Sequence, residues 1–228
     1  MSANFQDRED AARQLGEKLK PRDLRDPLVL AIPRGGVVTG AVLARCLRAE
    51  LDVALSRKLR APHQPEYAIG AIGEDGRVTL NADAHRVSGM SDEYLEEEKQ
   101  RQLAEIARRR ELIRGVRPAA RIRGRSVIVT DDGIATGSTM IAALQSLRAH
   151  RPHELIVAVP VAAPDRLAEV RRWCDDAVCL QAPRGFWAIG QFYDRFDQID
   201  DDEVLRLLRE NAVTPASGTD RGSDPRTP

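Results

Sequence analysis

The sequence predicts an α/β fold, a doubly wound and mostly parallel sheet flanked by helices. Short runs of β-branched and aliphatic residues, typical of strands buried on both faces, alternate with segments of helical periodicity. The chain has 228 residues, of which 42% are hydrophobic, and this is enough for one sizeable core between two layers of helix. We therefore expect a single domain over residues 1–212. Residues 213–228 are rich in Pro, Gly, Ser, Thr and Asp, so we expect a disordered tail there.

The first half of the chain contains alternating helices and strands and then a hairpin. Predicted helices cover residues 4–20 and 37–49, and apolar runs predict strands over residues 28–32 and 51–55. Residues 56–67 are polar and contain two prolines, so we interpret them as a mobile loop. The turn Glu74-Asp75-Gly76 between the apolar runs 68–72 and 77–80 predicts a hairpin that extends one edge of the sheet.

The second half begins with one long predicted helix over residues 92–114. Its charges, including the i,i+4 pairs Glu97/Arg101 and Glu105/Arg109, indicate a solvated face, with a homodimer contact as the alternative. The remaining predicted elements are strands over residues 127–130, 154–161 and 177–180 and helices over residues 138–147, 164–173 and 201–208.

The composition excludes several classes of partner. The 35 basic and 35 acidic residues cancel, so no overall field attracts nucleic acid or an anionic membrane. No apolar run approaches the length of a membrane span. Cys46, Cys174 and Cys179 are widely spaced and no signal-peptide pattern is present, which indicates a reducing cytoplasm. We therefore expect a cytoplasmic protein without nucleic-acid or membrane partners, in which any anion site is local.

The most informative stretch is residues 127–140. A buried β-branched strand runs into Asp131 and Asp132, and a turn of small residues follows before a helix opens at Ser138 or Thr139. Backbone N–H groups, hydroxyls and the helix N-terminus make such a turn an anion site. Carboxylates repel phosphate, so the acidic pair must serve sugar hydroxyls or a divalent cation. This combination indicates a phosphorylated sugar; an ordinary strand–helix turn that carries Asp-Asp-Gly is the alternative.

The same stretch resembles the phosphoribosyl pyrophosphate (PRPP) motif of the type I phosphoribosyltransferases. The resemblance implies a Mg²⁺-dependent enzyme that moves the 5-phosphoribosyl group of PRPP to a planar nitrogenous base and releases pyrophosphate. Asp131 and Asp132 would hold the ribose hydroxyls, directly or through Mg²⁺. The residues expected to bind the 5′-phosphate are Ala135, Thr136, Gly137, Ser138 and Thr139.

A second loop supports the same chemistry. Arg34, Gly35 and Gly36 follow the apolar run at residues 28–32, and ligands of open α/β sheets bind at the carboxyl ends of the strands. Arginine offers a planar, bidentate donor to phosphate oxygens, and the glycines permit close approach. In the resembling family the corresponding loop holds pyrophosphate, so we expect these three residues to bind it. In isolation, an Arg-Gly-Gly turn is more often an ordinary tight turn.

The basic pair Arg57-Lys58 resembles the pair that opens the catalytic loop of the orotate and adenine phosphoribosyltransferases. The resemblance assigns both residues to catalysis, where they would neutralise the departing pyrophosphate. Glu66 followed by Tyr67 is the nearest equivalent of a catalytic glutamate and tyrosine in the adenine enzymes, in a loose alignment. His63 falls where the orotate enzymes also have a histidine. A solvated basic loop is the alternative interpretation.

Near the C-terminus, the spacing of Trp187, Gly190 and Asp194 resembles the hood of the hypoxanthine-type enzymes. The resemblance implies a small hood formed by roughly residues 182–200 and the N-terminal helix. Trp187 would stack on the base, and Asp194 would contact Mg²⁺ together with the acidic pair. Ile134 is assigned to the base as well.

Several alternatives stay open. Many hypoxanthine and guanine enzymes have a carboxylate where this chain has Ala135, and the loop here resembles that of the adenine enzymes instead. The acceptor therefore stays open between a purine, a related heterocycle and a non-purine base. Phe192 and Phe196 fit either a ligand surface or a satellite core. A non-catalytic sensor of PRPP or a nucleotide is the rival function. A sugar-phosphate hydrolase with Asp131 as nucleophile is a weaker third.

Overall fold

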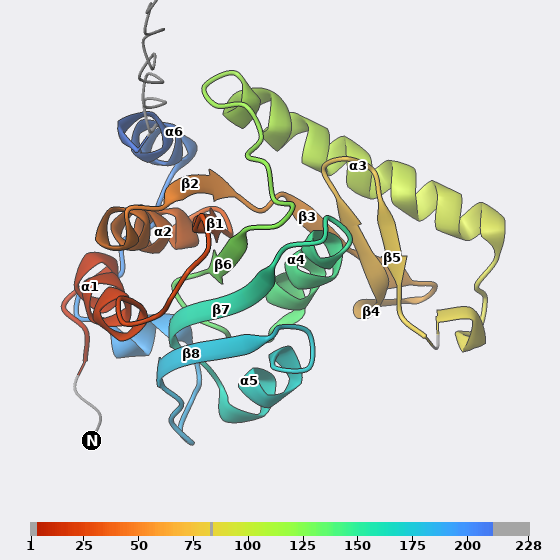
Figure 1. Ribbon diagram of the computed structural model, residues 1–228. Helices are drawn as coiled ribbons and strands as arrows, with labels where there is room; N and C mark the ends of the chain where they lie inside the picture. The colour runs from red at the N-terminus through yellow and green to blue at the C-terminus, as the bar shows by residue number, and fades with distance from the viewer. Residues whose placement is uncertain (1–3, 83, 212–228) are drawn as a thin grey trace, which may run out of the picture.

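A five-stranded parallel sheet forms the centre of the computed structural model, which describes residues 4–82 and 84–211 except for the side chains of Pro65, Glu66 and His85. The strand order is β2-β1-β6-β7-β8 (Figure 1). The strands are β1 (Leu28–Ala31), β2 (Glu50–Val53), β6 (Ser126–Thr130), β7 (Glu154–Val161) and β8 (Asp176–Gln181). The parallel α/β sheet predicted from the sequence is therefore confirmed, and the predicted tail lies outside the described residues.

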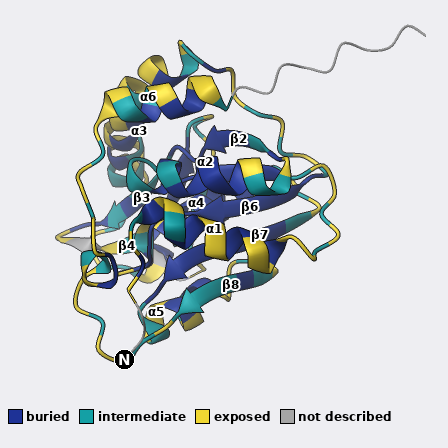
Figure 2. Ribbon diagram, turned by 90° about the vertical axis from the view of Figure 1, so that its left-hand side faces the viewer, coloured by how far each residue is buried: buried dark blue, intermediate teal, exposed yellow. Residues whose placement is uncertain are grey.

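Helices cover both faces of this sheet, because successive residues of each strand point to opposite sides. In β1, Val29 belongs to one core cluster together with Leu15 and Leu43, and Leu30 belongs to a second cluster together with Leu144. The first cluster lies under α1 (Arg8–Leu19), α2 (Gly35–Leu47) and α6 (Asp201–Glu210), and the second under α4 (Ser138–Arg148) and α5 (Pro164–Val170). Figure 2 shows the buried strands between these layers.

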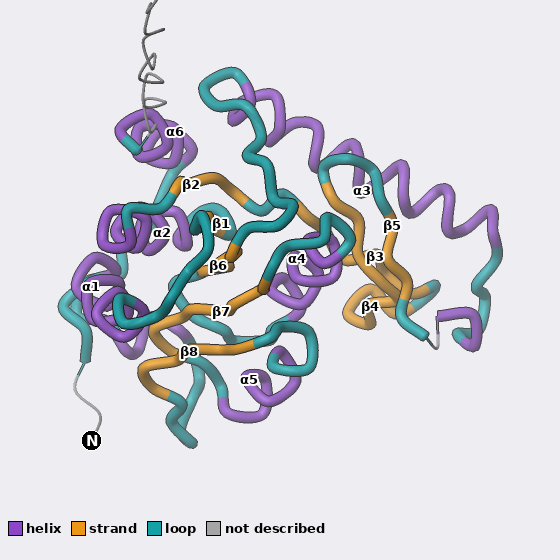
Figure 3. Tube along the Cα trace, in the orientation of Figure 1, coloured by secondary structure: helices purple, strands orange, loops and turns teal. Residues whose placement is uncertain are grey.

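A second, antiparallel sheet replaces two sequence predictions. It consists of β3 (Ser56–Ala61), β4 (Gln64–Gly73) and β5 (Val78–Leu80), and it lies to one side of the main sheet (Figure 3). The predicted mobile loop at residues 56–67 is therefore wrong. The predicted hairpin is present as the β4–β5 pair, but it belongs to this second sheet and not to an edge of the main sheet. Tertiary packing outweighs the polar composition, because Leu59 and Ala61 are buried against neighbouring elements.

The long helix α3 (Asp92–Arg114) has the predicted bounds and packs along the second sheet. Short 3-10 helices follow β5 and β8, over Ala84–Arg86 and Ile189–Phe192. The predicted i,i+4 pairs of α3 are wrong: Arg101 pairs with Glu98 at 3.2 Å, and Glu105 faces Arg57 at 3.9 Å. No helix within residues 4–82 and 84–211 combines the length and apolar character needed to cross a membrane.

Arg114, at the end of α3, joins the two sheets. Its guanidinium donates to Asp52 of β2 at 2.7 Å and to Glu74, in the β4–β5 turn, at 2.9 Å. The Asp52 side chain is only 3% exposed. A carboxylate this deeply buried requires its counter-ion, because the cost of removing it from water is otherwise uncompensated.

Arg114→Gln should therefore lower the free energy of unfolding by about 3 kcal/mol, since it leaves the Asp52 carboxylate buried without its ion pair. Urea denaturation measures the change. Arg110→Gln is the matched control, because Arg110 is exposed on the same helix and its loss should cost less than about 0.5 kcal/mol. Equal stability of the two variants would contradict this account of the Arg114 contacts.

Candidate active site

The predicted site residues meet where the chain leaves two adjacent strands in opposite directions. Strand β1 pairs with β6, and β1 continues into α2 on one face of the sheet while β6 continues into α4 on the other. Such a switch point opens a crevice at the carboxyl ends of the strands. The Arg34–Gly36 loop follows β1 and the Asp131–Thr139 loop follows β6, so both lie at this edge of the sheet.

Gly35 and Gly36 lie directly against the acidic pair. A β-carbon at Gly35 would be 2.1 Å from Asp132 Oδ2, and one at Gly36 would be 2.9 Å from Asp131 Oδ1. Any larger residue would have to displace a carboxylate, so the two loops approach this closely only because both positions are glycine. The Pro33–Arg34 peptide bond is cis, which no feature of the sequence indicated.

Asp132 is held by a residue that the sequence analysis missed. Arg8 Nε lies 2.8 Å from Asp132 Oδ2, and the Arg8 guanidinium carbon lies 3.7 Å from the centroid of the Phe196 ring. The Tyr193 hydroxyl donates to the backbone carbonyl of Asp132 at 2.6 Å. One carboxylate oxygen of Asp132 is thus engaged by α1. No local motif marks Arg8, because its contact spans most of the chain.

Asp131 has the opposite electrostatic character. Burial, and then the neighbouring Asp132 carboxylate, raise the pKa of Asp131 well above its usual range. Its Oδ1 accepts a hydrogen bond from the backbone N–H of Asp132 at 2.8 Å. A carboxyl group whose pKa is perturbed is a candidate functional group, and Asp131 is half-buried whereas Asp132 is buried.

The predicted phosphate loop has the geometry of an anion site. Gly137 adopts a φ of +78°, a left-handed conformation that other residues rarely take, and α4 begins at the next residue. The first-turn N–H groups of a helix have no intrahelical acceptor, and here Ser138 is half-buried and Thr139 exposed. Thr136 Oγ1 lies 3.1 Å from Ser138 Oγ. Ile134 is only 2% exposed and packs in the core, so its assignment to the base is corrected.

The basic pair and the phosphate loop line one cavity of about 200 Å³. Arg57 and Lys58 enter it from β3, and Ser138 and Thr139 enter it from α4. Arg57 Nε donates to Gln102 Oε1 at 3.1 Å, which fixes its side chain against α3. On the pyrophosphate loop, Arg34 pairs with Asp201 of α6 at 3.1 Å.

Other predicted residues lie apart from this cavity. Trp187 is 91% exposed. Asp194 is exposed and accepts a hydrogen bond from Asn4 at 3.2 Å. Within the described ranges, no three His, Cys, Asp or Glu side chains form a metal-binding group, so Asp194 does not complete a cation site with Asp131 and Asp132. The side chain of Glu66 lies outside the described structure.

Phe192 and Trp173 differ in their exposure to solvent. Phe192 is 5% exposed and packs with Phe5 and Tyr193 in a small core cluster, which favours the satellite-core interpretation of Phe192. The helix predicted over residues 164–173 ends at Val170, so Trp173 lies beyond α5, and it is 36% exposed. With Thr136, it lines a cavity of about 420 Å³.

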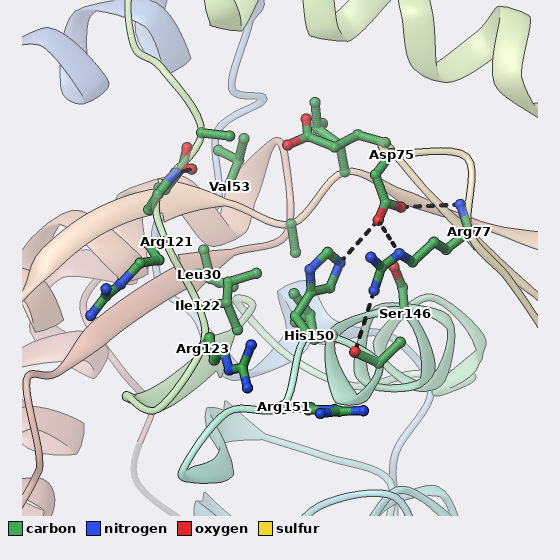
Figure 4. Close-up of a pocket in the computed structure, with 18 of the residues that line it drawn as sticks. Leu30, Val53, Asp75, Arg77, Arg121, Ile122, Arg123, Ser146, His150 and Arg151 are labelled. Atoms are coloured by element: carbon green, nitrogen blue, oxygen red, sulfur yellow. Dashed lines mark hydrogen bonds and ion pairs between the residues drawn. The ribbon is translucent and has the colours of Figure 1, made fainter.

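A cavity of about 660 Å³ lies away from these residues, between the β4–β5 turn and the end of α4 (Figure 4). Asp75 is shared there by Arg77 at 3.2 Å and by His150 at 3.3 Å. None of the residues predicted to bind a ligand lines this cavity. Its size alone therefore does not make it the active site.

Known proteins resemble this chain over most of its length. A family model described as a phosphoribosyl transferase domain matches residues 3–196. Two Mycobacterium tuberculosis proteins, provisionally named phosphoribosyl transferases, are each 41% identical over 223 residues, which is 97% of this chain and 50% of theirs. This chain thus spans about half the length of these curated relatives. The crystal structure of TT1426 from Thermus thermophilus has a TM-score of 0.87 at 42% identity, with 91% of this chain and 98% of that chain covered.

Asp131→Asn should make the protein more stable at neutral pH. Because the pKa of Asp131 is higher in the folded than in the unfolded protein, its contribution to stability is full at low pH and is lost as pH rises through the folded pKa. The advantage of the variant should therefore be absent near pH 3 and should grow as pH rises. Thermal unfolding across this range tests it. The exposed Asp23, changed to Asn, is the control and should show no such trend.

Proposed function

The chain belongs to the phosphoribosyl transferase family, and from this premise we propose that it transfers the 5-phosphoribosyl group of PRPP to a planar nitrogenous base and releases pyrophosphate. One observation supports the proposal above the others. The cavity of about 200 Å³ joins Arg57 and Lys58 to Ser138 and Thr139, so groups suited to two separate phosphates surround one space. A molecule with phosphates at both ends, such as PRPP, matches that arrangement.

Each end of PRPP has its own set of residues in the proposal. The 5′-phosphate binds the loop Ala135–Thr139, where N–H groups and hydroxyls converge at the start of α4. The pyrophosphate binds Arg34, the backbone of Gly35 and Gly36, and the basic pair of β3. Asp131 faces the ribose hydroxyls, and Asp132 contributes mainly through its ion pair with Arg8, which fixes the acidic turn.

In the proposed reaction, the bond between the anomeric carbon and the pyrophosphate oxygen breaks and a bond from that carbon to a base nitrogen forms. Positive charge develops on the ribose ring in such glycosidic transfers, and negative charge develops on the leaving group. Arg34, Arg57 and Lys58 stabilise the pyrophosphate. The carboxylate of Asp131 favours the ring cation, and fixed positioning of the two reactants supplies the rest.

These residues fit a Mg²⁺ ion that is held jointly by the protein and the phosphates of PRPP. Mg²⁺ usually keeps several waters and is held by one or two carboxylates together with substrate phosphates. Asp131 supplies one carboxylate at the crevice, and described residues place no third acidic or histidine ligand beside it and Asp132. When bound with PRPP, the ion would neutralise pyrophosphate charge. Asp131 is the residue that we propose to hold it.

A screen of purine, pyrimidine and related bases with PRPP and Mg²⁺, with pyrophosphate release as the signal, tests the activity. We expect release with at least one base, and its loss by orders of magnitude in Asp131→Asn. Protein that binds PRPP but releases no pyrophosphate with any base would support a sensor instead. The acceptor class, including a purine, is itself an outcome of this screen.

Gly137→Val should weaken PRPP binding roughly 10-fold or more, because valine is strained at a φ of +78° and the loop must rearrange to accept it. Isothermal titration calorimetry with PRPP measures the effect, and circular dichroism reports on folding. Gly185→Val is the control, since a β-carbon at Gly185 meets nothing within 4 Å. Unchanged affinity in a folded Gly137→Val protein would remove the phosphate role of this loop.

Trp187→Ala should weaken the acceptor base roughly 5- to 150-fold if the exposed ring stacks on it, since such stacking is worth about 1–3 kcal/mol. PRPP affinity should change little, because the proposed PRPP contacts lie on other loops. Calorimetric titration of the base identified in the screen measures the effect. Trp173→Ala, which alters the other exposed tryptophan, is the comparison. A larger loss in Trp173→Ala than in Trp187→Ala would place the base elsewhere.

A further inference from the structure

Arg109 of α3 reaches the proposed PRPP cavity, although the spacing of α3 indicated a solvated face. It lines the same cavity of about 200 Å³ as Arg57, Lys58, Ser138 and Thr139. The helix therefore forms part of the wall of this cavity. An arginine in such a wall has a planar fork of donors that suits phosphate oxygens.

The expected partner of Arg109 is directed elsewhere. Glu105 stands one helical turn before Arg109, but its carboxylate faces Arg57 at 3.9 Å. Among the residues that the structure describes, no carboxylate lies within ion-pair distance of Arg109. Yet Arg109 is half-buried. A partly desolvated guanidinium without a counter-ion favours an anion that arrives from outside.

The whole cavity has an excess of positive charge. Among the described residues, the charged lining consists of four cations and one anion, namely Arg57, Lys58, Arg60, Arg109 and Glu105. Arg60 also lacks a full set of hydrogen bonds, because its Nε is buried without a partner in the described structure. A concave surface lined by one sign of charge concentrates ligands of the opposite sign.

Arg109 also lies beside the loop proposed for pyrophosphate. A small adjoining cavity is lined by Arg109, Pro33 and Asp201, and Asp201 is the ion-pair partner of Arg34 at 3.1 Å. Arg109 thus stands between the Arg34 loop and the basic pair of β3. These are the two segments assigned to the leaving group.

We propose that Arg109 binds the pyrophosphate group of PRPP, as a residue supplied by α3 in addition to the Arg34 loop and the basic pair. The inference rests on the function proposed above and specifies its leaving-group site. The position of α3 is fixed independently of any ligand: the Glu98 carboxylate accepts from the backbone N–H of Arg60 at 3.1 Å, and the Tyr94 hydroxyl donates to the Arg60 carbonyl at 3.0 Å. The part of α3 that precedes Arg109 is therefore anchored to β3 before a ligand arrives.

Calorimetry with three probes, each in the presence of Mg²⁺, tests the proposal. Pyrophosphate and PRPP contain the group that Arg109 would bind, and ribose 5-phosphate lacks it. Arg109→Gln should weaken pyrophosphate and PRPP about 10- to 100-fold, the usual effect of losing a charged hydrogen bond, and should leave ribose 5-phosphate unchanged. Arg109→Lys, which keeps the charge but not the planar fork, should recover part of the loss.

Arg108→Gln is the matched control, because Arg108 is exposed on the same helix and lines none of these cavities. It should bind all three probes as the wild type does. Unchanged pyrophosphate affinity in Arg109→Gln, or an equal loss for ribose 5-phosphate, would overturn the proposal. Wild-type protein that binds no pyrophosphate would overturn it too. If pyrophosphate binds through Arg109 but no base yields turnover, the proposed function fails while the pyrophosphate site stands.

Discussion

The buried ion pair between Arg8 and Asp132 is the contact on which the arrangement of the site depends. It links the N-terminal helix to the turn after the central strand, and Phe196 closes over the same guanidinium. Through it, three distant segments of the chain meet at the carboxyl end of the sheet. Because an unpaired carboxylate at this depth is costly, the position of α1 and the conformation of the acidic turn cannot vary independently.

The neighbouring carboxyl groups of Asp131 and Asp132 have different surroundings. Asp132 has a fixed counter-ion and links the acidic turn to α1. Asp131 has none of comparable proximity among the described residues, and its pKa is raised by burial and by its neighbour. A charged group kept in an unfavourable environment lowers the stability of the fold. Such groups are typical of functional sites, where a bound ligand can compensate the cost. The acidic pair thus combines a carboxylate that has a fixed counter-ion with a carboxyl group whose pKa is raised by its surroundings.

The sequence predicted the parts of this structure that depend on local pattern. Strand β6 and the turn at Gly137 were predictable, because β-branched runs and small-residue turns have direct conformational causes. Arg8 was not, since its partner lies 124 positions away along the chain. Arg57 was assigned to the site but to a mobile loop, because a polar composition does not reveal that α3 will cover the segment. Ile134 was misplaced for a similar reason: motif position says nothing about which way a side chain faces.

The bracing of β3 by α3 has a thermodynamic consequence. Gln102 fixes the Arg57 side chain, and Glu98 and Tyr94 fix the backbone of Arg60. The conformational entropy of this cationic strand is therefore lost when the chain folds rather than when an anion binds. Binding of an anion to β3 should therefore carry only a small entropic penalty from ordering of the chain. Its rate should follow the electrostatic attraction of the basic wall, which salt screens, rather than the pace of a closing segment.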